Sequence, residues 1–178
     1  DRPRSYAKAI ERICAEPPKV PPGSDFIYSD LNFILLGEII QQTSGELLDA
    51  FTKRNLWEPL QMWETGFLPD KTKKRRIAPT EKHGLGYLRG TVHDPTSRLI
   101  GGVTGHAGVF STAPDVARFG RMMLNGGSLD GVRVLSQESV AEMTRIHERG
   151  RGLGWDLDSW LARLPRGDKF TVGKSYGH

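Results

Sequence analysis

The sequence predicts an α+β domain made mainly of helices, with short strands and long loops between them. Apolar residues recur at helical spacing in several segments, and in residues 31–43 they nearly encircle the predicted helix. Between Trp57 and Asp94, proline and glycine are scattered without a sustained period, which is typical of loops with short strands. The length of 178 residues, with 21 glycines and 11 prolines, fits one loop-rich domain.

Three helices are predicted in the first part of the chain. Residues 5–15 have an apolar face and end before a Pro-Pro pair, which cannot continue a helix. Residues 31–43 follow, and either Ser29 or Asp30 can cap them. Residues 46–55 form the third helix, which ought to bury Leu47, Leu48 and Phe51.

Two more helices and two strands are predicted further on. Thr112 is a capping hydroxyl for a helix that reaches about Leu124, and Ser136 begins a helix over about 137–147. Short strands are expected at 86–92 and 152–157. The residues predicted to face inward on the two helices are Val116, Phe119, Met123, Val140, Met143 and Ile146.

Composition excludes several classes of protein. The net charge of +4 comes largely from residues 71–76, and no aromatic residue is interleaved there, so a solvated loop is favoured over a nucleic-acid site. No stretch approaches the roughly 20 apolar residues that span a bilayer. The single cysteine, Cys14, excludes an internal disulfide, and its helical position suggests a buried small side chain.

The most informative motif is Tyr28-Ser29-Asp30, directly before the apolar helix. It places a phenol, a hydroxyl and a carboxylate beside one helix N-terminus, where the helix dipole favours negative charge. Such groups are suited to proton transfer.

The motif and five further segments, in the same order, resemble the β-lactamase-related serine hydrolases. This family holds class C β-lactamases, D-alanyl-D-alanine carboxypeptidases and lactamase-like esterases. The resembling segments are PPGSDFIYSDLNFILLGEIIQQTSG, LWEPLQMWETGFLP, RIAPTE, GTVHDPTSRLIGGVTGHAGVFSTAPDVARFGRMMLNGG, GLGWD and SYGH. The resemblance implies a β-lactamase/transpeptidase-like fold, of which this chain is mainly the helical portion. Most of the family's sheet is then missing, so some apolar helix faces should be exposed.

The resemblance also implies roles for individual residues. Tyr28 matches the family's acid/base phenol, and His178 matches the start of a Gly-His-Thr-Gly strand motif that stops at its histidine. Asp30 stands where many members have asparagine; it either shapes the site or only caps the helix. Ser29 and His106 are candidates for substrate binding, with structural hydrogen bonding as the other reading of His106.

The nucleophile of this family is a serine one helical turn before a lysine. Ser5 and Lys8 match that spacing, but Ser5 lies only 23 residues before Tyr28, whereas the family has a much longer separation. We therefore expect the true serine and lysine to lie upstream. Residues 1–178 would then be a partial serine hydrolase domain, without its nucleophile segment and third-motif strand, and inactive alone.

The predicted substrate is a small molecule or a peptidoglycan-like peptide, cleaved at an ester, amide or β-lactam bond. No cofactor, metal or nucleic acid is expected, and the missing parts of the domain are the expected partner. Periplasmic, secreted and cytoplasmic locations all fit the sequence.

Two other functions stay open: a non-catalytic binding module of the same family, and a metal-binding domain that uses His93, Asp94 and His106. Four aromatic residues could line a substrate pocket, but we predict that they pack in the core, because aromatic residues scattered along a sequence are more often buried there. These four residues are Trp57, Trp63, Phe67 and Phe110.

Overall fold

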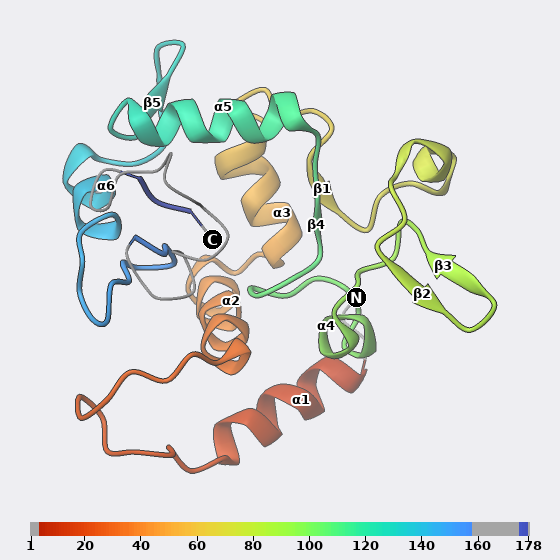
Figure 1. The fold of residues 1–178 in the computed structure, drawn as a ribbon, viewed down its shortest axis with the longest axis horizontal. Helices are drawn as coiled ribbons and strands as arrows, with labels where there is room; N and C mark the ends of the chain where they lie inside the picture. The colour runs from red at the N-terminus through yellow and green to blue at the C-terminus, as the bar shows by residue number, and fades with distance from the viewer. Residues whose placement is uncertain (1–3, 158–174, 178) are drawn as a thin grey trace. The chain divides into compact units, whose positions relative to one another are not determined.

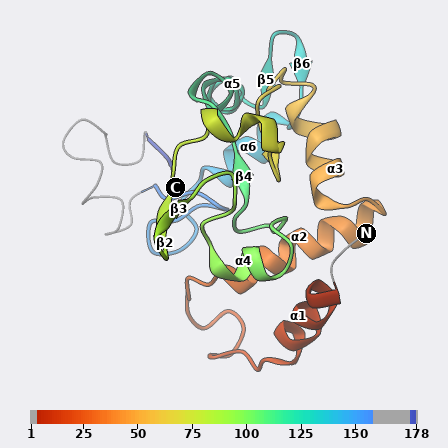
Figure 2. The same cartoon turned by 90° about the vertical axis from the view of Figure 1, so that its right-hand side faces the viewer.

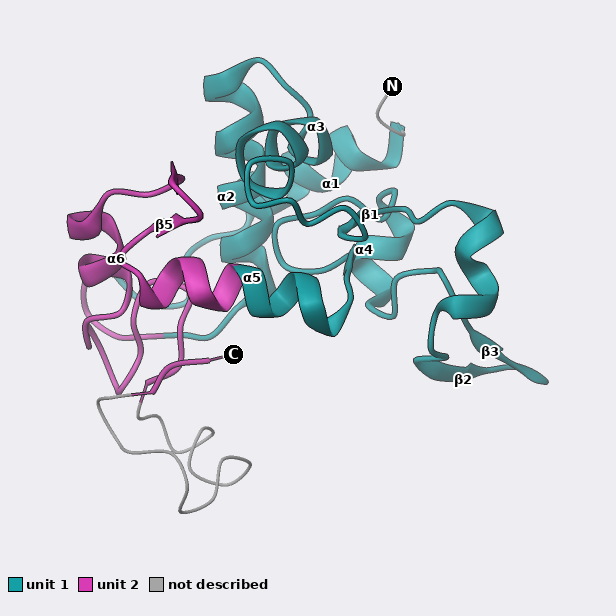
Figure 3. Ribbon diagram, turned by 90° about the horizontal axis from the view of Figure 1, so that it is seen from above, with its two compact units in different colours: residues 1–22, 27–118 teal, residues 23–26, 119–178 magenta. Residues whose placement is uncertain are grey.

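The structure is a computed structural model, and it describes residues 4–157 and 175–177. It divides into two compact units, coloured in Figure 3. Unit 1 comprises residues 1–22 and 27–118, and unit 2 comprises residues 23–26 and 119–178. The boundary falls inside helix α5, Ala113–Leu124.

Helices α1 (Arg4–Ala15) and α2 (Asp30–Ser44) confirm the first two predicted helices, and Figures 1 and 2 show their positions. Tyr6 joins them, since its buried hydroxyl donates to Glu38 at 2.9 Å and accepts from Gln41 Nε2 at 2.8 Å. Cys14 is exposed, so the expectation of a buried thiol was wrong. The polar Tyr6 contact fixes the buried side of this helix, which turns Cys14 outward.

Helix α2 has both predicted ends. Ser29 is the N-cap, with its hydroxyl accepting from the backbone N–H of Leu31, and Gly45 ends the helix in the left-handed conformation at φ 72°. Ile34 is buried, but Leu36 and Ile39 on another side are about half exposed. An apolar face of α2 is therefore exposed, as the sequence predicted for some of the helices.

The third predicted helix is split. Helix α3 (Leu48–Thr52) continues as a π-helical turn, η1 (Lys53–Trp57). Leu48 is buried, whereas Leu47 is exposed because it is the N-cap rather than a helical residue.

The remaining part of unit 1 consists of loops with short elements, as predicted. Strand β1 (Gly66–Phe67) pairs antiparallel with β4 (Val109–Phe110), so that Gly66 faces Phe110. Strands β2 (Glu81–His83) and β3 (Gly86–Leu88) form a hairpin, and β3 is shorter than predicted. The basic run is a 3-10 helix, η2 (Lys71–Arg76), and α4 spans Pro95–Leu99.

In unit 2, Ser136 caps helix α6 (Gln137–Met143), and β5 (Ser128–Leu129) pairs with β6 (Val132–Arg133). Helix α6 ends four residues earlier than predicted, and Ile146 beyond it is exposed. The strand expected at 152–157 exists only as isolated bridges that involve Asp156.

Helix α5 buries only part of the predicted face: Met123 is buried as predicted, whereas Val116 is not. Val116 is exposed, while Met122 and Met123 are buried. The cause lies in the first turn, where buried Asp115 accepts hydrogen bonds from the backbone N–H of Glu64 and the hydroxyl of Thr65. An acidic side chain thus occupies the inner face, and Val116 is rotated outward.

Apolar side chains from several helices and loops form the core of each unit. The buried apolar residues of unit 1 are Tyr6, Ile34, Leu48, Trp57, Leu60, Met62, Val92 and Ile100. Those of unit 2 are Met122, Met123, Leu129, Val140 and Leu157. Within the residues described, no helix is both long enough and apolar enough to cross a membrane.

Candidate functional site

The Tyr-Ser-Asp motif lies at the start of α2. Tyr28 is in the extended segment before the helix and is 53% exposed, so its phenol is accessible. Ser29 uses its hydroxyl as the helix cap, and Asp30 is the first helical residue. The carboxylate of Asp30 therefore benefits from the positive end of the helix dipole.

A second part of the site comes from α4 and the loop after it. Asp94 is the N-cap of α4: its Oδ1 accepts from the backbone N–H of Ser97 at 2.6 Å. The same oxygen lies 2.9 Å from His106 Nε2. The His106 side chain is only 5% exposed, so this contact is protected from water.

The loop is held in place by polar contacts and by a close backbone approach. Thr104 donates to the hydroxyl of Ser97, which is buried in α4, and to the carbonyl of Ala107. A Cβ on Gly105 would lie 2.0 Å from the carbonyl oxygen of Phe33 in α2. Glycine is thus required for the loop to touch α2, and this contact brings His106 to the beginning of that helix.

The result is a cluster of three ionisable side chains. One ligand atom from each of Asp30, Asp94 and His106 lies within 4.8 Å of the other two. We call this the Asp30–Asp94–His106 cluster. Carboxylate oxygens and an imidazole nitrogen are suitable ligands for zinc and similar ions, so these three residues could hold a cation.

The electrostatics of the cluster follow from burial and hydrogen bonding. Burial raises the pKa of Asp94, but the backbone N–H of Ser97 and the imidazole of His106 outweigh it and hold that pKa below its usual range. An ionised carboxylate only accepts, so Nε2 of His106 must donate. Nδ1 of His106 is buried and has no hydrogen-bond partner among the described residues, which is characteristic of a site that receives a ligand or water.

Sequence reasoning placed His93 with Asp94 and His106, and the structure replaces it with Asp30. His93 instead lies with Nε2 3.9 Å from a carboxylate oxygen of Glu81 on β2. The sequence did contain a signal for the true neighbour, because Gly105 precedes His106 and permits the contact with α2.

The remaining predicted residues lie elsewhere. Ser5 and Lys8 are on α1, where neighbouring Tyr6 contacts Glu38. Glu38 is eight residues after Asp30, about 12 Å along α2. His178 lies outside the described residues, but Gly177 before it pairs with Asp156 through hydrogen bonds of 2.7 and 3.0 Å. The GLGWD segment and the SYG residues are thereby brought together within unit 2.

Comparison with known proteins shows the family to which the chain belongs. A family model described as Beta-lactamase matches residues 1–178. A provisionally named D-alanyl-D-alanine carboxypeptidase of Escherichia coli (strain K12) is 32% identical over 189 residues, covering 96% of this chain and 44% of that protein. A protein of the same provisional name from Salmonella agona (strain SL483) is 32% identical over 193 residues, covering 98% and 45%. The chain therefore spans less than half the length of these relatives.

Solved structures agree on the fold. A penicillin-binding-protein homologue from Caulobacter crescentus has a TM-score of 0.67 at 21% identity, covering 98% of this chain and 53% of that one. A penicillin-binding protein from Bacillus halodurans has a TM-score of 0.62 at 18% identity, covering 85% and 46%. The predicted fold class, β-lactamase/transpeptidase-like α+β, is confirmed.

Proposed function

Because the chain belongs to the Beta-lactamase family, we propose that it is part of a serine hydrolase that cleaves an ester, amide or β-lactam bond through an acyl-serine intermediate. The observation that carries the proposal is the exposed Tyr28 phenol, two residues from the Asp30–Asp94–His106 cluster at one helix N-terminus. The names of the bacterial relatives point to the same type of reaction.

In this mechanism Tyr28 is the general acid and base. Its phenol transfers the proton between the nucleophilic serine and the leaving group. A phenol loses its proton near neutral pH only if a nearby cation stabilises the anion, so Tyr28 depends on a lysine to work. His178, at the start of the third motif, contributes to the substrate or oxyanion side.

Asp30, Ser29 and His106 shape the substrate side of the site. An ionised Asp30 cannot donate a hydrogen bond to a substrate amide, unlike the asparagine found in many family members. This difference favours ester or peptide substrates over β-lactams. Peptidoglycan-like peptides are therefore included among the proposed substrates.

The nucleophile of this reaction is a serine outside residues 1–178. Two observations support this. Tyr6 attaches α1 to Glu38, about 12 Å along α2 from Asp30, so α1 joins α2 away from the motif. In addition, the chain spans less than half the length of its relatives.

The decisive experiment compares this chain with a longer reading frame that contains an upstream Ser-x-x-Lys motif. We expect the longer protein to hydrolyse a nitrophenyl ester or a chromogenic β-lactam, and residues 1–178 alone to be inactive. Tyr28→Phe in the longer protein should lower kcat about a hundredfold or more, since it removes the proton-transfer group. Tyr87→Phe is the matched control, because Tyr87 is also exposed but lies on β3.

Two outcomes would contradict the proposal. Activity of residues 1–178 that is abolished by Ser5→Ala would make Ser5 the nucleophile. A longer protein that binds peptidoglycan-like peptides but turns over none of the substrates would instead support the non-catalytic binding module.

A further inference from the structure

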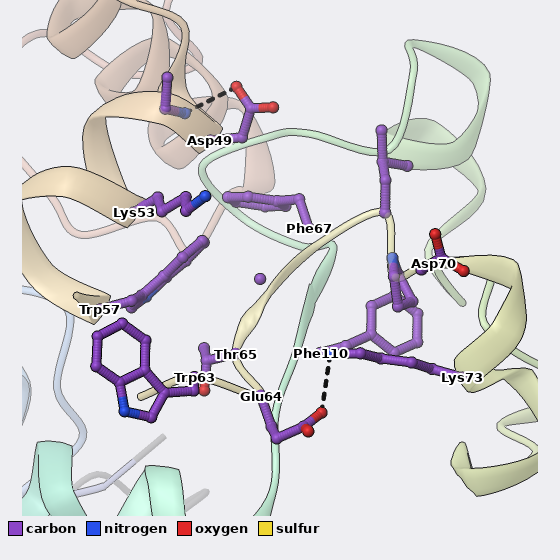
Figure 4. A pocket seen from close by; sticks show the side chains of 14 residues that line it. Asp49, Lys53, Trp57, Trp63, Glu64, Thr65, Phe67, Asp70, Lys73 and Phe110 are labelled. Carbon is purple, nitrogen blue, oxygen red and sulfur yellow. Dashed lines mark hydrogen bonds and ion pairs between the residues drawn. The ribbon is translucent and has the colours of Figure 1, made fainter. Parts of the chain in front are cut away.

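A pocket of about 480 Å³ opens in unit 1 between η1, β1, β4 and the start of η2. Figure 4 shows the side chains around it. Of the described residues that line this pocket, none is Tyr28 or a member of the Asp30–Asp94–His106 cluster. Its volume lies within the range of roughly 300–1,000 Å³ that is typical of small-molecule sites.

Four aromatic side chains line the pocket, although the sequence favoured core packing for them. Trp57 is buried and packs against Phe67, with ring centroids 5.7 Å apart. Trp63, in contrast, is 67% exposed. In Figure 4 the two indole rings lie on one side of the pocket and Phe110 on the other. Because exposure of a large aromatic surface is unfavourable, the open Trp63 ring is a strong candidate for ligand contact.

Charged groups of both signs surround these rings. Asp49 and Lys53 come from the α3–η1 helix, and Asp70 and Lys73 from the start of η2. Oδ1 of Asp70 accepts hydrogen bonds from the backbone N–H and the hydroxyl of Thr72, whereas Oδ2 accepts none from the described residues. Lys53 Nζ is 3.7 Å from a Glu58 oxygen, too far for a hydrogen bond.

The third acidic group of the pocket is already neutralised. Glu64 accepts from Lys73 Nζ at 2.9 Å and from Arg76 at 3.3 Å. These contacts hold the pKa of Glu64 below its usual value, and the carboxylate stays charged but paired. The pocket therefore presents separate hydrogen-bond donors and acceptors without a strong net charge.

We propose that this pocket binds a saccharide ring stacked on Trp63. The C–H face of a sugar matches an indole surface, and its hydroxyls can donate to Asp49 and Asp70 and accept from Lys53 and Lys73. A wholly apolar ligand would bury these charged groups without hydrogen bonds, which is unfavourable. An ionic ligand of either sign would meet repulsive as well as attractive charges, since both carboxylates and lysines line the pocket.

The test is a titration with two neutral probes, maltotriose and the trimer of N-acetylglucosamine, followed by tryptophan fluorescence and ligand-observed NMR. We expect saturable binding of at least one of them in the millimolar range. Trp63→Ala should weaken that binding at least tenfold, and Lys53→Met should weaken it less. Tyr87→Ala is the matched control, since Tyr87 is 69% exposed but outside the pocket, and it should leave the affinity unchanged.

Failure of both trisaccharides to bind would overturn the proposal, as would binding that Trp63→Ala leaves intact in a variant with an unchanged circular dichroism spectrum. Saturable binding of benzyl alcohol but of neither saccharide would identify an apolar site instead. Because the titration measures binding without turnover, its result is independent of whether the serine hydrolase mechanism is correct.

Discussion

Two pairs of an acid with a base, one in each unit, differ in what they can do. In unit 1, His106 donates to Asp94 at 2.9 Å; in unit 2, Arg151 lies 3.2 Å from Asp156. Arg151 and Asp156 are 9% and 8% exposed, and the backbones of both residues form a β-bridge. The Arg151 guanidinium also lies over the Phe26 ring, 5.9 Å from its centroid.

The two pairs differ in whether the basic side chain is fully engaged. A guanidinium stays charged at every accessible pH, so the pair in unit 2 is a fixed structural link. The imidazole of His106 has a second ring nitrogen, Nδ1, which is buried and has no hydrogen-bond partner among the described residues. The Arg151–Asp156 pair stabilises the fold of unit 2, whereas the His106–Asp94 pair can respond to a ligand at the Asp30–Asp94–His106 cluster.

The largest effect is expected from breaking the pair in unit 2. Arg151→Met removes the guanidinium beside the buried carboxylate of Asp156, and we expect the free energy of unfolding to fall by about 3–5 kcal/mol. Urea denaturation followed by circular dichroism measures this loss.

The double variant Arg151→Met, Asp156→Leu is the control for this prediction. It removes both charges, so most of the stability should return. A double variant as unstable as the single one would show that the charge pair is not the cause of the loss.

A smaller effect is expected from Gly105→Ala, which acts on the pair in unit 1. The added methyl group would meet the Phe33 carbonyl at 2.0 Å, so the loop must move away from α2. We expect a loss of about 1–3 kcal/mol in stability, measured by the same denaturation. In the longer protein, hydrolysis should fall as well.

Gly86→Ala is the matched control, because a Cβ there meets no atom within 4 Å. Equal effects of the two substitutions would mean that the contact between the loop and α2 does not determine the stability of the site.

The smallest effect is the contribution of Asp94 to acid stability. Its pKa is lowered in the folded state, so the unfolded chain binds more protons in acid. The stabilisation is present above the ordinary value of 3.8 and is lost as the pH falls below it toward the lowered pKa. Asp94→Asn, which can still cap α4, should flatten this part of the pH profile of the melting temperature. An unchanged profile would exclude this contribution.

Much of the fold was predictable because its signals are local. The helix α2, its Ser29 cap and its Gly45 end follow from the apolar pattern and capping chemistry, and the family resemblance is confirmed. The errors concern long-range contacts. Val116 of α5 is exposed because its neighbour Asp115 binds residues about fifty positions earlier, and a helical pattern in the sequence does not show such a contact.

The candidate site was predictable only in part for the same reason. Tyr28 and Asp30 are two residues apart in the sequence, and their position at the helix start was expected. The approach of His106 depends on a backbone contact at Gly105, which spacing alone could not assign to α2. The roles of Tyr28, Ser29, Asp30, His106 and His178 stay predictions.

One oxygen, Oδ1 of Asp94, both caps α4 through Ser97 and orients the ring of His106. The start of α4 and the orientation of the imidazole are therefore thermodynamically linked. A ligand that draws His106 away from Asp94 changes the stability of the first turn of α4 against local opening. The exchange rate of the Ser97 amide hydrogen should therefore change when a ligand binds at His106, and NMR can measure this change without any substrate turnover.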